Sequence, residues 1–279
     1  MAFILSITHH VEPARRIVAA VLALMLAPAV SAAPVCKGTI YLTFDTGSQS
    51  QAELIADTLR RHHAKATFFL ASEKTVRNDF SLSPAWAPYW KMLQEEGHAF
   101  GSHTFDHVYA LRDLDHGMME VRPQFGPQAG QKLAWTAADY CSELRRVDQR
   151  FRELTGVALD PFWRAPGGKL TPATLAAGQA CGYAHVGWAP AGFSGDELSS
   201  ERISNAALLK RALDGLRDGD IFVAHLGIWS RKDPWAPAVL EPLLSGLEQK
   251  GFCFATLRDH PDYRAKAMPA SAATREKHR

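Results

Sequence analysis

The sequence lacks the features that would place it in a specialised class of protein. It contains no internal repeat, no coiled-coil heptad and no long low-complexity segment, so its 279 residues have the composition of an ordinary globular protein. Neither sign of charge is in clear excess, with 31 Lys and Arg against 29 Asp and Glu. The net charge of +2 gives no electrostatic reason to expect nucleic acid or an anionic membrane surface as a partner, and a neutral polymer fits better.

Cysteine is scarce, and its spacing argues against a structural zinc site. The chain has four cysteines, and none forms a CxxC or Cys/His pattern typical of bound zinc. All four follow residue 35. An even number in an exported protein permits two disulfides in three possible pairings, and buried free thiols are the alternative.

The N-terminal apolar run is too short for a membrane span. It extends from Ile17 to Val30, about 14 residues, where a span needs roughly 20, and Pro28 interrupts it. Arg15 and Arg16 precede it and small residues follow. We therefore expect residues 1–32 to be a signal peptide, and the mature protein to be periplasmic or extracellular with no stable membrane insertion.

Strand and helix patterns alternate along the rest of the chain. Expected strands cover 39–44, 66–70, 98–102, 162–163, 184–188, 220–225 and 252–257, and expected helices cover 52–63, 84–96, 137–154, 171–181, 205–216 and 237–250. This alternation predicts one α/β domain with a mostly parallel sheet, closed or nearly closed into a barrel. Residues 113–136, rich in Gly, Pro and Gln, are expected to form a long surface insertion, and residues 263–279 a disordered tail.

Four chemically versatile residues follow predicted strands. Asp45, His103, Arg164 and His225 each stand at or just after a strand end, and active residues of parallel barrels come from those ends. Each has an ordinary alternative when taken alone: a turn former, a surface or core histidine, or an arginine in solvent. Together they provide a carboxylate base, an orienting cation and titratable imidazoles, so we expect them to meet in one site.

A second histidine strengthens the case for a metal. His103 and His107 form an HxxxH pair in GSHTFDH, and two imidazoles on one helical turn can share an ion. Taken alone, such a pair is more often structural than ligating.

The motifs, in this order, resemble the polysaccharide deacetylase family, the NodB-homology carbohydrate esterases of carbohydrate esterase family 4. TFDTG at 43–47 is similar to the family's TFDDG, HTFDH at 103–107 to its HTxxH, and RAPGG at 164–168 to its RxPxG. FVAH at 222–225 is similar to the fifth motif, and AKATFFL and GHAFGSH are typical linking segments. The resemblance covers about residues 37–262, and we expect the domain to span 36–262.

The resemblance implies a distorted (β/α) barrel and a set of roles. Asp45 is implied as the general base for a water that attacks an acetamide carbonyl, and Arg164 as the residue that orients it. His103 and His107 are implied ligands of a divalent metal ion, with zinc expected, and His225 as the acid that protonates the departing amine.

Two further positions follow from the same resemblance, and one of them departs from the family. The backbone amide of Gly167 occupies the place of the amide that helps hold the oxyanion. Thr46 stands where the family has a second Asp, its third metal ligand, and a neutral hydroxyl is a weaker ligand than a carboxylate. Water, substrate or Asp106 are the alternatives for completing the site.

The fourth motif also departs from the family. An Asp three residues after a Trp usually tunes the catalytic histidine, but Ala191 occupies that position after Trp188. Asp196, five residues further on, is a candidate replacement. If no carboxylate replaces it, we expect His225 to have a lower pKa and to be a weaker acid.

The barrel topology suggests the disulfide pairing. A closing parallel barrel places its first and last strands side by side, so Cys36 is expected to pair with Cys253. Cys141 and Cys181 then form the second bridge.

Aromatic residues cluster after the motif strands. Trp188, Trp229 and Trp235 are candidates for substrate binding, because aromatic faces stack on sugar rings, and the alternative is core or rim packing.

The resemblance implies an N-deacetylase that acts on an extracytoplasmic polysaccharide such as peptidoglycan, a chitin-like polymer or poly-N-acetylglucosamine. The alternatives are a catalytically impaired glycan-binding protein of the same fold and an amidase or esterase that acts on a small acetylated molecule.

Overall fold

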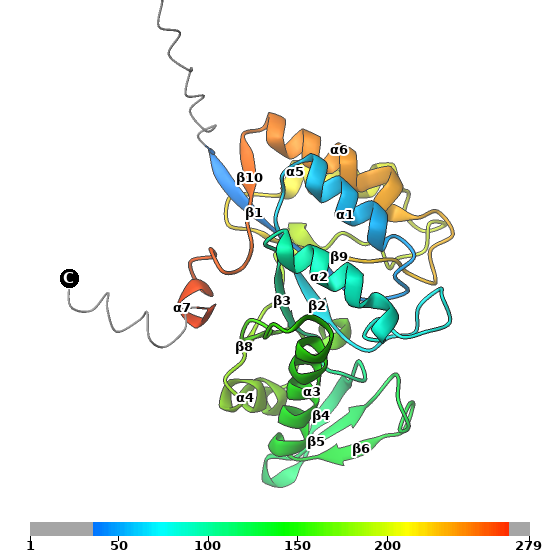
Figure 1. Ribbon diagram of the computed structural model, residues 1–279, viewed down its shortest axis with the longest axis vertical. Helices are drawn as coiled ribbons and strands as arrows, with labels where there is room; N and C mark the ends of the chain where they lie inside the picture. The colour runs from blue at the N-terminus through cyan, green and yellow to red at the C-terminus, as the bar shows by residue number, and fades with distance from the viewer. Residues whose placement is uncertain (1–35, 268–279) are drawn as a thin grey trace, which may run out of the picture. The chain divides into compact units, whose positions relative to one another are not determined.

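The computed structural model describes residues 36–267 (Figure 1). Its strands are β1 (Gly38–Asp45), β2 (Ala66–Leu70), β3 (Ala99–Ser102), β4 (Tyr109–Asp113), β5 (Met119–Arg122), β6 (Leu133–Trp135), β7 (Phe162–Trp163), β8 (Ala184–His185), β9 (Ile221–His225) and β10 (Phe252–Phe254). Its helices are α1 (Ala52–Arg61), α2 (Ala87–Glu95), α3 (Ala137–Thr155), α4 (Pro172–Ala180), α5 (Asn205–Gly215), α6 (Trp235–Gln249) and α7 (Arg264–Ala267). The expected signal peptide, 1–32, lies outside the described residues.

A curled parallel sheet forms the centre of the fold. Its strand order is β10-β1-β2-β3-β7-β8, and β9 pairs with β1. Between β8 and β9 the regular ladder gives way to a loop, where the amides of Ala189 and Ser194 donate to the carbonyls of Ile221 and Val223. The barrel is therefore distorted, and the prediction of a single α/β domain of this kind is confirmed.

Strand β1 shows how the alternation of side chains places the site. Ile40, Leu42 and Phe44 are fully buried in the cluster formed with α1, α2 and α6. Because side chains of a strand alternate between its two faces, Thr43 and Asp45 face the other way, into the barrel. The helices thus cover the outer face of the sheet (Figure 1), and the polar residues of β1 are left for the inner face.

The expected surface insertion contains a second sheet. Strands β4, β5 and β6 pair in antiparallel order within residues 109–135. Met119 and Val121 alternate inward from β5 and pack against Tyr140 and Leu144 of α3. The expectation of a long surface insertion missed these strands, because they are only 3 to 5 residues long and turn residues dominate the composition around them.

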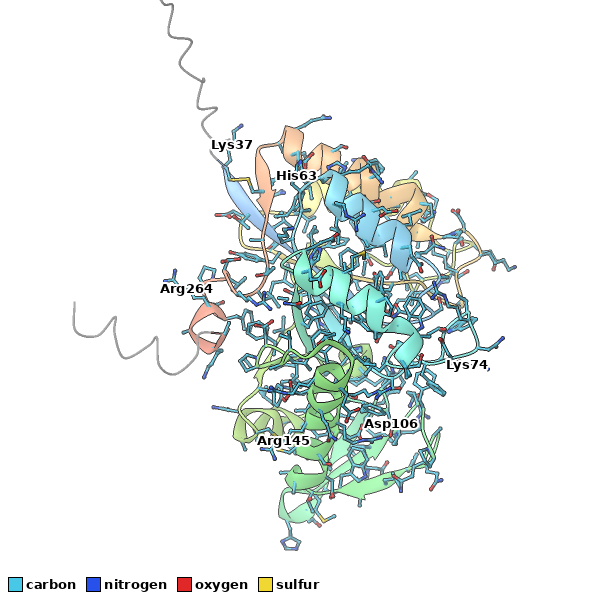
Figure 2. All side chains as sticks on the ribbon, in the orientation of Figure 1. Lys37, His63, Lys74, Asp106, Arg145 and Arg264 are labelled. Carbon is cyan, nitrogen blue, oxygen red and sulfur yellow. A yellow bond between two sulfur atoms is a disulfide. The ribbon has the colours of Figure 1, made fainter. Side chains whose placement is uncertain are left out.

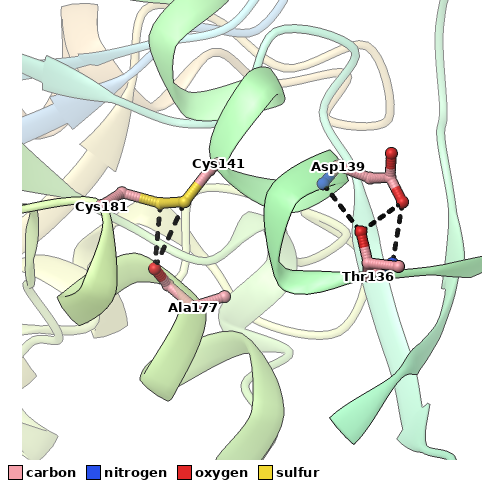
Figure 3. The surroundings of a disulfide bond; sticks show 5 residues. All are labelled: Thr136, Asp139, Cys141, Ala177 and Cys181. Atoms are coloured by element: carbon pink, nitrogen blue, oxygen red, sulfur yellow. Dashed lines mark hydrogen bonds between the residues drawn. A yellow bond between two sulfur atoms is a disulfide. The ribbon is translucent and has the colours of Figure 1, made fainter.

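Both expected disulfides are present. Cys36 and Cys253 join the starts of the paired strands β1 and β10, with a Cα–Cα distance of 5.7 Å. Cys141 of α3 and Cys181, after α4, form the second bridge, also with a Cα–Cα distance of 5.7 Å (Figure 3). This second bridge attaches the end of α4 to α3.

Two local signals set the ends of α3, much as the sequence indicated. At the start, the Asp139 amide donates to the Thr136 hydroxyl while the Thr136 amide donates to the Asp139 carboxylate, a capping box (Figure 3). At the end, Gly156 has a φ of 84°, a left-handed conformation that glycine adopts without steric cost.

The expected disordered tail begins with structure. Arg264–Ala267 form α7, and Tyr263 packs edge-on against Phe162, with ring centroids 5.9 Å apart. This contact with the barrel corrects the expectation for the first residues of 263–279, and residues 268–279 lie outside the described part. Within residues 36–267, no helix has the length and apolar character of a membrane span.

Candidate active site

The four strand-end residues expected to meet do converge. Asp45 ends β1 and lies in register with His225 at the end of β9. His103 follows β3, and Arg164 follows β7, which pairs with β3. The parallel sheet brings their side chains to one edge of the barrel, as the strand-end rule predicts.

A buried ion pair forms the base of the site. Arg164 is fully buried, and its Nη1 donates to Oδ1 of Asp45 and to the hydroxyl of Thr43, both at 2.8 Å. Its Nε and Nη2 donate to the carbonyls of Val186 and Gly187. The guanidinium is thus held by several acceptors, which fixes the carboxylate that it faces.

These contacts keep Asp45 ionised. Burial raises the pKa of the Asp45 carboxyl, but the Arg164 guanidinium beside it lowers that pKa by more, so the net pKa lies below the usual value. An ionised carboxylate can accept a proton from water.

The histidine pair lies on a turn, which corrects the expectation of a helical turn. Thr104 and His107 have φ values of 57° and 49°, and the Val108 amide donates to the Thr104 hydroxyl at 2.7 Å, which closes the turn. The two imidazole rings are nevertheless adjacent, with centroids 5.0 Å apart.

The hydrogen bonds of His103 define its tautomer. Nδ1 donates to the backbone carbonyl of Arg164 at 3.0 Å, and because a carbonyl only accepts, Nδ1 carries the hydrogen. Nε2 is then unprotonated and lies 3.6 Å from Oδ2 of Asp45. Burial lowers the pKa of His103 to about 3, even though the Asp45 charge raises it. The ring is therefore neutral, the form that binds metals.

This donor set fits a divalent cation, although it is incomplete as it stands. Nδ1 of His107 is buried without a hydrogen-bond partner, and His103 presents an unprotonated nitrogen close by. Neutral imidazole nitrogens are ordinary zinc ligands. Among residues 36–267, however, no three side chains of His, Cys, Asp or Glu already stand together as a metal site.

The residues expected to complete this site have other partners. The Thr46 hydroxyl donates to Oε1 of Glu73 at 2.6 Å and accepts from the Ala71 amide at 3.0 Å. Asp106, labelled in Figure 2, accepts from Nη1 of Arg146 at 3.0 Å. That ion pair attaches the turn to α3, which corrects the suggestion that Asp106 substitutes as a ligand.

Asp196 supplies the carboxylate that the fourth motif lacks. Nδ1 of His225 lies 3.0 and 3.2 Å from the two carboxylate oxygens of Asp196, and the backbone amide of His225 donates to the same group at 2.7 Å. The Ser194 hydroxyl holds the carboxylate from the other side. Burial lowers the pKa of His225, but the Asp196 charge and hydrogen bond raise it more, to about 10. The expectation of a weakened acid does not apply, because His225 is protonated at neutral pH.

His107 and His225 open onto a cavity of about 530 Å³. Gly167, His107, His225 and Trp229 line it as expected, and the ring of Trp229 is 62% exposed at its rim. Gly167 has a φ of 59°, and a Cβ there would lie 3.1 Å from Tyr109. A side chain at position 167 would therefore be strained and would crowd the wall of the cavity.

Other lining residues were not anticipated from the sequence, among them Glu73, Tyr109, Phe125 and Glu197. Tyr109 belongs to β4, and Phe125 follows β5, so the small antiparallel sheet provides one wall. No sequence signal identifies these two. Glu73, by contrast, follows shortly after the end of β2, and the strand-end rule applied to that strand would have indicated it.

Two of the candidate tryptophans stack on other aromatic side chains of the protein. Trp188 stacks on Phe193 at 6.3 Å between centroids, and the Arg164 guanidinium lies 5.6 Å from its ring centre. Trp235 is 4% exposed and stacks on Phe222. Because this buried ring has no face free for a sugar, Trp235 is a core residue and the expectation of a stacking platform there is corrected.

Fold and site together define a class of protein. Asp45, held ionised, and His225, held protonated, end two paired parallel strands, and His107 and His225 line one cavity at that edge of the sheet. This arrangement is that of a hydrolase that uses acid–base catalysis.

Comparison with known proteins gives the family. Residues 32–186 match the polysaccharide deacetylase family. The chain is 25% identical over 221 residues to a peptidoglycan-N-acetylglucosamine deacetylase of Bacillus cereus, covering 79% of this chain and 86% of that one. It is 26% identical over 233 residues to a chitooligosaccharide deacetylase of Azorhizobium caulinodans, covering 79% and 93%.

A solved structure agrees in fold. A family 4 carbohydrate esterase from Streptomyces lividans, in complex with acetate, superposes with a TM-score of 0.57 at 20% identity, covering 80% of this chain and 94% of that one. The chain belongs to the polysaccharide deacetylase family. The prediction of a hydrolase that acts on carbon–nitrogen bonds other than peptide bonds is thereby confirmed at the level of the family.

Proposed function

We propose that this protein is a metal-dependent N-deacetylase that releases acetate from N-acetylated sugars of an extracytoplasmic polysaccharide. The observation that carries the proposal is the pairing of Asp45 with Arg164 and of His225 with Asp196 at adjacent strand ends. The first pair keeps a base ionised and the second keeps an acid protonated, which is the division of labour that amide hydrolysis requires.

The residues act in a defined order. Asp45 accepts a proton from the attacking water, and the backbone amide of Gly167 donates to the developing oxyanion. His225, protonated at its site beside Asp196, donates a proton to the departing amine. His103 and His107 would hold the cation, and zinc or a similar ion would supply Lewis acidity to the acetamide carbonyl.

The cavity supports a polymeric substrate. It is open at the surface, and Tyr109, Phe125 and Trp229 place aromatic rings on its wall and rim. Aromatic faces pack against the apolar faces of sugar rings. The names of the relatives favour peptidoglycan or a chitin-like oligosaccharide over a small acetylated molecule.

An exported location is part of the proposal. Two disulfides join strands and helices within the fold. Disulfides persist in oxidising compartments, so a periplasmic or extracellular protein is expected.

Acetate release is the direct test. Purified protein, as isolated and after treatment with a chelator, is incubated with N-acetylglucosamine oligomers of increasing length, and free acetate and free amines are quantified. We expect turnover that rises with chain length, disappears with chelator and returns with added zinc. Equal rates on a monomer would favour the small-molecule alternative. Binding of oligomers without any acetate release would favour the impaired glycan-binding alternative.

A further inference from the structure

A second, smaller cavity lies beside the catalytic one. Its volume is about 200 Å³, and it shares the lining residues His225, Gly227 and Ile228 with the cavity of about 530 Å³. The two cavities therefore adjoin at the histidine that acts as the acid. Sites for drug-sized ligands occupy about 300–1,000 Å³, so the smaller cavity suits a small molecule.

Arg231, which lines the smaller cavity, is a buried cation without a counter-charge. Arg164 and Arg231 are the buried arginines of residues 36–267. Arg164 forms an ion pair with Asp45, whereas Arg231, at 6% exposure, forms no ion pair within that part of the chain. A buried charge is costly unless an opposite charge compensates it, so this guanidinium favours an anion in the cavity.

Neutral acceptors hold the guanidinium of Arg231 and leave one donor free. Nε donates to the carbonyl of Asp233, and Nη1 donates to the carbonyl of Leu198. Nη2 donates to the carbonyl of Ile203 and to the side-chain oxygen of Asn205. Because an arginine has five N–H donors, one hydrogen on Nη1 is left without an acceptor in the described part of the chain. These contacts fix the orientation of the guanidinium and do not neutralise its charge.

The start of helix α6 adds further donors to the same cavity. Trp235 and Ala236, the first residues of the helix, line the cavity, and Pro234 before them has no side-chain group that could cap the helix. The indole N–H of Trp235 is buried and has no hydrogen-bond partner among residues 36–267. An uncapped helix N-terminus attracts negative charge, so this end of the cavity also favours an anion.

The other charges around the cavity leave a positive balance. Asp196 lines the cavity, but it pairs with His225, whose imidazolium offsets the carboxylate. The exposed carboxylate of Asp233 accepts from the side-chain amide of Asn205. The charge of Arg231 is therefore the uncompensated one among the lining residues.

We propose that this cavity is a site for a small carboxylate anion, and that acetate, the product of the proposed reaction, binds there through Arg231 and the N-terminus of α6. The inference rests on the proposed function for the identity of the anion. A carboxylate accepts charge-assisted hydrogen bonds from a guanidinium, and the apolar side chains of Ile228 and Ala236 line the cavity for the methyl group.

Acetate binding to protein without metal tests the inference in the absence of turnover. The full chain is treated with a chelator, so that acetate cannot bind to a metal ion, and titrations with isotope-labelled acetate are followed by NMR. Acetamide, which is similar in size and carries no charge, is the control ligand. We expect saturable binding of acetate and about tenfold weaker binding of acetamide.

Three variants locate the bound acetate. Arg231→Met removes the uncompensated charge and should weaken acetate binding by ~30-fold, the loss expected for charge-assisted hydrogen bonds. Trp235→Phe removes the unpaired N–H, keeps an aromatic ring beside Phe222 and should weaken acetate binding by ~5-fold. Lys232→Met removes an exposed positive charge one residue from Arg231 and should leave the affinity within about twofold of the parent.

Melting temperatures separate binding from folding. Arg231→Met also loses hydrogen bonds to the surrounding loops, whereas Trp235→Phe removes an N–H that has no partner among the described residues. If Arg231→Met does not fold, unchanged acetate affinity in Trp235→Phe would overturn the inference. Equal affinities for acetate and acetamide, no saturable binding of acetate, or equal losses in Arg231→Met and Lys232→Met would also overturn it.

The result stands apart from that of the deacetylase assay. Acetate binding that depends on Arg231, in a protein that releases no acetate from oligosaccharides, would contradict the proposed function and leave the anion site intact. Acetate release by a protein whose metal-free form does not bind acetate would do the reverse.

Discussion

Asp45 and Asp196 are both buried carboxylates of the same site, but they face different cations. Asp45 meets a guanidinium, which stays charged at every accessible pH, and its own pKa is lowered. Asp196 meets an imidazole, and the visible consequence is the raised pKa of that partner, His225, to about 10. An aspartate is thus itself the base in the first pair and keeps its histidine partner an acid in the second. The partner decides which of the two groups can exchange a proton.

The largest effect is expected when the base, Asp45, is removed. We expect Asp45→Asn to lower the rate of acetate release by ~1,000-fold at all pH values, in the range of general acid–base contributions. Initial rates on a chitooligosaccharide measure it, with the melting temperature as a check on folding. Turnover close to that of the parent would contradict the assignment of Asp45 as the base.

Removing the cation of the first pair, Arg164, should lower the stability of the folded protein. Arg164→Met leaves Asp45 buried without its counter-charge, and breaking a buried pair in this way costs about 3–5 kcal/mol in the free energy of unfolding. Urea unfolding at neutral pH gives the value. The double variant Arg164→Met, Asp45→Asn should recover part of the loss, and no recovery would mean that the packing of Arg164, rather than its charge, stabilises the fold.

Removing the carboxylate of the second pair, Asp196, should shift the alkaline limb of the pH dependence of kcat. The pKa of His225 is raised to about 10 by Asp196, so the acid form persists through neutral pH and is lost only as the pH rises through that value.

In Asp196→Asn the pKa of His225 falls toward its ordinary value near 6.5, and the alkaline limb of kcat moves several units to lower pH. At pH 8 the rate should fall by ~30-fold, while below about pH 6 it approaches that of the parent. A full pH profile of kcat checks this expectation, and an unmoved alkaline limb would contradict it.

The smallest effect is expected at the rim, outside both pairs. Trp229→Ala should raise KM for oligosaccharides by about fivefold with little change in kcat, because stacking of an exposed ring contributes on the order of 1 kcal/mol to binding. Steady-state kinetics on oligomers of increasing length measure it. Trp235→Ala is the matched control, since this buried ring should affect stability rather than KM. Equal changes in KM for both variants would argue against a platform at Trp229.

Prediction from the sequence succeeded where local pattern and position along a strand decide the outcome. The strand ending at Asp45 and the helix that Gly156 terminates follow from short-range rules, and the pairing of the cysteines in the first and last strands follows from the expected barrel topology. It failed where turn geometry intervenes. The HxxxH spacing is compatible with one turn of a helix and with a turn in a loop. Thr104 and His107 adopt left-handed backbone conformations, so both imidazoles lie on a turn in a loop.

Other misses come from contacts that spacing along the chain does not encode. Tyr109 and Phe125 reach the cavity because the small sheet packs on α3. The sequence did not predict this sheet, because its strands are short and turn residues dominate the composition around them. Glu73 is linked to the site through the hydroxyl of Thr46, which lies 27 residues earlier in the chain. Such contacts form only when the parallel strands stand side by side.

By itself the sequence determined which residues could act and at which strand ends they stand. Periodicity and motif order place Asp45, His103, Arg164 and His225 at one edge of a parallel sheet, because all such strands run in one direction. Only the tertiary structure decided their protonation and their partners. The meeting of Asp196 with His225, and of Thr46 with Glu73, depends on loops from separate strands. Desolvation and the charge of Asp196 together set the pKa of His225.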